Sequence, residues 1–217
     1  MLPSECKMPD LSDLLVSPPD KPFLTHQLIG AEAGFPETML AYRRNFVRLA
    51  DKAARDYTDV RKCVLLLIRL RKLGKLEIAR GRLLMNVTVN KLEDCIITVR
   101  RLFNYFERVK SDPTNFPLDR TFKRRINAME RSISDVRDLI VHLDEDIYHG
   151  RVAAGQPIAP DLDERTTTIS LGSTTLPVEI LARAIRHFHN FASDFAKYEF
   201  STEGTYKQMP KSGPVKS

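Results

Sequence analysis

The 217-residue sequence has no tryptophan, only nine glycines and three cysteines, and few of the motifs that identify common enzyme classes. It contains no glycine-rich phosphate loop, Cys-x-x-Cys pair, Gly-x-Ser-x-Gly nucleophile elbow or His-Glu-x-x-His zinc motif. The sequence therefore lacks the signals of a P-loop NTPase, a zinc-ribbon protein, an α/β-hydrolase and a zinc protease. We expect no cofactor.

Long apolar runs are missing as well. The longest, Cys63 to Ile68, is far too short to span a bilayer and is followed by Arg69 and Arg71. The N-terminal residues MLPSECKMPD lack the basic start and apolar core of a secretory signal. Cys6 and the other two cysteines have no metal-like spacing and suit free thiols in a reducing compartment. We expect a cytoplasmic protein without membrane contact.

Charge is abundant but unevenly distributed. The net charge is +6, yet residues 43–131 hold 23 Lys or Arg against 10 acids, and residues 132–200 hold 6 against 11. A basic half favours contact with polyanions, with nucleic acid ahead of an anionic membrane. Two alternatives stay open: the cations only keep helix surfaces soluble, or basic and acidic parts pair within the fold or across a dimer.

The order of patterns predicts one helical domain with irregular ends. Residues 1–37 are rich in proline and predict an extended, partly disordered arm with a short turn near residues 11–16. Apolar steps of three and four predict helices over residues 37–73, 83–110, 119–148 and 177–200. Residues 151–176 predict an excursion that contains a small β-hairpin, because residues 166–171 are rich in β-branched side chains. The polar tail, residues 201–217, predicts disorder.

The helix from Asp119 to Tyr148 has the most regular pattern. Eight apolar residues recur at alternating steps of four and three without an interrupting proline or glycine, which predicts one stripe packed against other helices. The stripe is Phe122, Ile126, Met129, Ile133, Val136, Ile140, Leu143 and Ile147.

Beside this stripe lies the string Arg137-Asp138-Leu139-Ile140-Val141-His142. An Arg, a polar residue, three more residues and a His, late in a long helix, resemble the Arg-x4–6-His motif of the HEPN superfamily. The following His-x-Asp-Glu run, from His142 to Glu145, is similar to uncharacterised HEPN-like proteins. The resemblance covers at most residues 38–200 through overall architecture, and this short motif carries its specificity.

The resemblance implies a metal-independent endoribonuclease whose site is completed across a homodimer. His142 would move protons and Arg137 would hold phosphate oxygens, roles that suit imidazole and guanidinium chemistry. Asp138 would orient the imidazole. Some members carry a tyrosine two positions after the His, where this chain has Asp144, so regulation by modification of that tyrosine is in doubt. Without the family, the same residues are only a charged helix surface.

Two further groups of residues have side chains with ligand-binding chemistry. Arg100, Arg101, Tyr105 and Arg108 predict a weak RNA-binding surface, since aromatic and guanidinium groups contact bases and phosphates. The row Asp138, His142, Asp146 and His149 repeats at helical spacing, but one helix cannot usually surround an ion, so we expect no metal site.

We therefore expect an all-α antiparallel bundle of four to five helices with a small β-hairpin before the last one. The leading function is a HEPN-like endoribonuclease, as a toxin or host-defence effector, with RNA, a second copy and an antitoxin or regulatory protein as partners. The alternative is a non-catalytic helical interaction or dimerisation module. Membrane-surface binding lacks an exposed apolar face in the sequence pattern.

Overall fold

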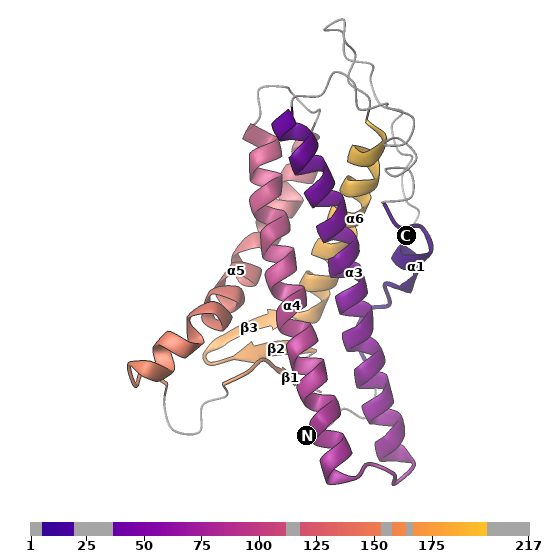
Figure 1. Ribbon diagram of the computed structural model, residues 1–217, viewed down its shortest axis with the longest axis vertical. Coiled ribbons are helices and arrows are strands. Elements are labelled where there is room, and N and C mark those ends of the chain that lie inside the picture. The colour runs from indigo at the N-terminus through magenta and orange to yellow at the C-terminus, as the bar shows by residue number, and fades with distance from the viewer. Residues whose placement is uncertain (1–5, 20–36, 112–117, 153–157, 164–166, 199–217) are drawn as a thin grey trace, which may run out of the picture.

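The protein is a bundle of long helices with a small antiparallel sheet against one side (Figure 1). The computed structural model describes residues 6–19, 37–111, 118–152, 158–163 and 167–198. The helices are α1 (Ser12–Val16), α3 (Glu37–Lys72), α4 (Ile78–Ser111), α5 (Arg120–Tyr148) and α6 (Val178–Lys197). The predicted all-α architecture with a small β-hairpin is confirmed.

The long hairpin of α3 and α4 forms the main axis of the bundle. Gly74 ends α3 with φ +63°, a conformation that glycine adopts without steric cost. The sequence pattern predicts that the second long helix begins at residue 83, whereas in the structure α4 begins at Ile78. The Gly81 amide already donates a hydrogen bond to the Glu77 carbonyl at 2.8 Å, so the glycine lies within the helix and does not interrupt it.

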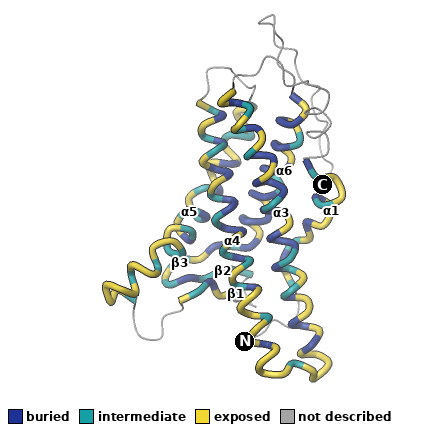
Figure 2. The backbone as a smooth tube through the Cα atoms, in the orientation of Figure 1, coloured by how far each residue is buried: buried dark blue, intermediate teal, exposed yellow. Residues whose placement is uncertain are grey.

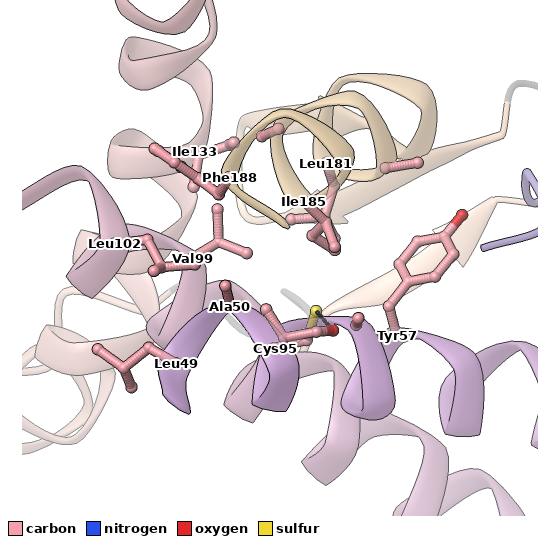
Figure 3. Packing of buried hydrophobic residues seen from close by; sticks show 14 of the residues in the cluster. Leu49, Ala50, Tyr57, Cys95, Val99, Leu102, Ile133, Leu181, Ile185 and Phe188 are labelled. Atoms are coloured by element: carbon pink, nitrogen blue, oxygen red, sulfur yellow. Dashed lines mark hydrogen bonds between the residues drawn. The ribbon is translucent and has the colours of Figure 1, made fainter. Parts of the chain in front are cut away.

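The core is built from the facing sides of α3, α4, α5 and α6, and it is rich in phenylalanine. Phe46 of α3 lies with its ring centroid 4.9 Å from that of Phe191 on α6, and Phe103 of α4 lies 4.8 Å from Phe188. Figure 3 shows α3, α4, α5 and α6 contributing side chains to this packing. Burial of this apolar surface is the main force holding the helices together.

The sheet contains one strand more than the sequence predicts. Strands β2 (Thr168–Leu171) and β3 (Thr174–Pro177) form the predicted hairpin, with Ile169 opposite Leu176 in the core. The additional strand β1 (Asp161–Asp163) pairs antiparallel with β2. Its sequence, Asp-Leu-Asp, lacks β-branched residues, so backbone pairing with β2 defines this strand rather than intrinsic propensity.

The N-terminal arm is partly packed against the body. Met8, Leu11 and Leu14 are buried, whereas the sequence pattern predicts an extended arm. Arg186 of α6 holds the arm by two hydrogen bonds to the Asp13 carboxylate, at 2.6 and 3.0 Å. Residues 20–36 of the arm and the tail after residue 198 lie outside the described residues.

Candidate functional site

The predicted motif lies on a part of α5 that extends beyond the core. The stripe of α5 is buried from Ile126 to Val136, but Ile140 and Leu143 are only half-buried and Ile147 is exposed. Figure 2 shows the change from buried to exposed along this helix. The predicted stripe is therefore wrong at its last position, Ile147, whereas Ile140 still packs against the core. Within the motif His142 and Asp138 are exposed, whereas Arg137 is half-buried.

Caps at both ends fix the position of α5. The Asp119 side chain accepts a hydrogen bond from the Phe122 amide at 3.1 Å, which satisfies a free N–H of the first turn. At the other end Gly150 has φ +65°, as expected for the predicted C-terminal stop. The turn brings the Arg151 amide within 2.8 Å of the Asp146 carbonyl.

Within the motif, the charged partners differ from those proposed from the sequence. Arg137 Nη1 lies 2.8 Å from Asp138 Oδ1, so this carboxylate holds the guanidinium. His142 Nδ1 lies 3.5 Å from Glu145 Oε2, and both side chains are 59% exposed. The carboxylate beside the imidazole is therefore that of Glu145. The three-residue spacing of His142 and Glu145 is the sequence signal that would have indicated this pair.

Arg137 and His142 do not face one another within one chain. Five residues apart on a helix, their side chains point about 140° apart around the axis. One helix therefore does not point both groups at a common position.

Arg151 is a site residue that the sequence patterns did not indicate. Its Nε lies 2.7 Å from Asp146 Oδ1 and its Nη2 lies 3.9 Å from Glu145 Oε1. This guanidinium offsets part of the negative charge beside the motif, whereas Asp144 stays exposed. Its contacts depend on the turn at Gly150, which helical spacing alone does not describe.

The possible metal ligands Asp138, His142, Asp146 and His149 lie in one row on α5 and its cap, and no described ligand from another element joins them. Among the described residues, no group of three or more His, Cys, Asp or Glu side chains is placed to hold a metal ion. His187 of α6 instead lies with its ring 6.0 Å from that of Phe122. His189 is buried, and burial lowers its pKa.

The four RNA-binding candidates on α4 divide into two pairs. Arg100 Nη1 lies 3.0 Å from Glu130 Oε1 of α5, and the Tyr105 hydroxyl accepts a hydrogen bond from Asn45 Nδ2 at 2.8 Å. Both of these side chains therefore connect helices. Arg101 and Arg108 are exposed. The surface available to a phosphate backbone thus consists of the second pair.

An apolar cavity of about 270 Å³ lies between α3, α4, α6 and β1, apart from the motif. Val64, Met85, Leu92, Leu162 and Leu181 are among its lining residues. Among the described residues that line it, Asp161 is the one acid and no side chain is basic. This described lining offers no acid–base pair of the kind that proton transfer uses.

None of the described helices combines the length and the low charge needed to cross a membrane. Comparisons of the chain with protein-family models, curated proteins and solved structures gave no match. The HEPN-like resemblance therefore depends on the motif itself.

Proposed function

We propose that the protein is a HEPN-like, metal-independent endoribonuclease that acts as a homodimer. The observation that carries the proposal is the position of Arg137 and His142 where α5 leaves the core, with His142 exposed and Arg137 half-buried. A guanidinium and an imidazole are the groups needed to steady a phosphorane and to move protons during attack by a 2′-hydroxyl. Their divergent directions suit a site shared by two copies.

The partners of the motif residues refine these roles. Glu145 lies where it would orient the His142 imidazole, and Asp138 holds Arg137 until a phosphate replaces it. The proposed toxin or host-defence role would place a regulatory protein over this same surface.

RNA cleavage by the purified protein in EDTA tests the proposal. We expect cyclic-phosphate products, and a loss of at least about 100-fold in rate for Arg137→Ala and for His142→Ala, the scale of general acid–base and electrostatic catalysis. The matched control Arg131→Ala changes an exposed residue of α5 outside the motif and should retain activity. Equal cleavage by all four proteins would identify a contaminating nuclease.

A second candidate is a non-catalytic interaction module, favoured by the apolar side chains exposed on the same helix end. Val141, Ile147 and Tyr148 are exposed there, and Tyr148 reaches 85%. No cleavage of a broad RNA panel, together with association that depends on these residues, would support the module over the enzyme.

A further inference from the structure

Two projecting parts of the molecule expose most of its surface leucine, isoleucine, valine, methionine and tyrosine. The first, here called the hairpin tip, is residues 65–87 of α3, α4 and their connection. The second, here called the acidic end, is residues 138–150 of α5 and its cap. Of the twelve exposed large apolar residues in the described chain, seven lie in the hairpin tip and three in the acidic end.

The hairpin tip extends past the other helices, so each of its two helices packs only on one side. Figure 2 shows the exposed surface that results. Ile78 is 78% exposed and Leu83 is 67% exposed. From the sequence pattern we expected no exposed apolar face on the basic helices. That expectation is wrong at the hairpin tip, where apolar side chains are exposed. Large exposed apolar patches on a protein surface mark interaction sites.

The two projecting parts carry opposite charge. The hairpin tip holds six Lys or Arg and a single acid, Glu77. The acidic end holds four acids and no Lys or Arg, although Arg137 and Arg151 flank it and pair with some of these acids. Asp144 makes no ion pair within the described residues, and neither do Arg80 and Arg82. Free charges of both signs therefore remain beside the exposed apolar side chains.

We propose that the hairpin tip of one copy binds the acidic end of a second copy. One chain cannot join its own two parts, because they diverge from the body in Figure 1. A twofold dimer makes the contact twice and closes the assembly. An anionic membrane or an RNA would account for the cations of the tip but would leave the exposed apolar residues of the acidic end uncovered. A second copy accounts for both.

This contact rests on the homodimer of the proposed function, and it adds the two surfaces that form the dimer. It brings cations of the partner's tip beside Arg137 and His142, where Asp144 and its neighbours would otherwise repel an RNA phosphate. The partner thus supplies the positive charge that the motif lacks within one chain. Complementary charges of this kind also fix the register and speed the association of the two copies.

Reversing the charges on each surface tests the contact. The measurement is the oligomeric state of the full chain in solution, from its mass by light scattering and sedimentation. The tip variant carries Arg80→Glu and Arg82→Glu, and the end variant carries Asp144→Lys and Glu145→Lys. Each should raise the dimer dissociation constant at least about tenfold, since like charges then face each other. A chain with all four changes should recover the dimer, because the signs are again opposite.

The control Arg101→Glu with Arg108→Glu makes the same charge change on another exposed part of α4 and should leave the dimer intact. Circular dichroism confirms that each variant is folded. A monomeric wild type, or a dimer that the tip variant leaves unchanged, would overturn the proposal. If that unchanged dimer lost binding to RNA or to anionic vesicles, the tip would serve that ligand instead. Cleavage is measured separately, so failure of the interface and failure of the enzyme are distinguished.

Discussion

His189 is the residue at which burial has the clearest consequence for stability. It lies on the core side of α6, and burial lowers its pKa, although a hydrogen bond with the Leu14 backbone and the charges of Asp51 and Asp13 act in the opposite direction. Because the folded pKa lies below that of the unfolded chain, the unfolded chain binds the proton first as the pH falls. The free energy of unfolding contributed by this group therefore decreases below its ordinary pKa.

We expect His189→Gln to reduce the loss of stability between about pH 7.5 and pH 5.5, since glutamine does not titrate. The measurement is the free energy of unfolding in urea at both pH values, compared with wild type. The difference between the proteins isolates His189, because raised pKa values at Glu93 and Asp194 act in the opposite direction in both. An unchanged pH dependence would mean that His189 does not control it.

At the scale of elements, the N-terminal arm shows how tertiary contacts define a short helix. Helix α1 has only five residues and no side-chain hydrogen bond at its N-cap, so it is too short to be stable alone. Leu11 and Leu14 bury their side chains, and the Tyr57 hydroxyl donates a hydrogen bond to the Pro9 carbonyl at 3.2 Å. Packing against α3 and α6 therefore holds the arm in place.

Leu11→Ala is expected to lower the free energy of unfolding by about 2–4 kcal/mol, because it leaves a cavity in a packed contact. Val16→Ala is the matched control, since Val16 is exposed at the other end of α1, and its effect should stay within about 0.5 kcal/mol. Urea unfolding measures both. Equal small effects would show that the arm contributes little to the fold, and hydrogen exchange in residues 6–19 would then show whether the arm detaches.

At the scale of the whole molecule, the basic balance predicts that binding to RNA weakens as salt increases. Each phosphate contact releases counterions, so the slope of log K against log salt counts the cations involved. For single-stranded RNA, the slope should fall by about 1.4 in magnitude when both Arg101 and Arg108 become alanine. Fluorescence anisotropy with a labelled oligonucleotide provides this slope.

Arg100→Ala is the control on the same helix. Arg100 is paired with Glu130 between α4 and α5, so its loss should affect stability more than the salt dependence. The same slope in wild type and in the double variant would show that RNA contacts another surface. Cations of the hairpin tip are the next group to test in that case.

The sequence by itself determined the helices, because apolar spacing and caps are local properties. Asp119, Gly150 and Pro177 lie at or next to the predicted ends of elements, and Ile126, Met129, Ile133 and Val136 of the predicted stripe are buried. The β2–β3 hairpin also followed from local composition. The motif was visible for the same reason, since Arg137 and His142 lie five positions apart on one helix.

Only the tertiary structure decided which parts of these patterns are covered. The stripe of α5 continues to Ile147, but its neighbours end earlier, so its last position is exposed. The partner of a charged side chain depends on the same geometry: Arg100 reaches Glu130 on another helix, and Arg151 returns to Asp146 through a turn. Periodicity describes one helix at a time, whereas burial and ion pairing depend on where neighbouring elements begin and end.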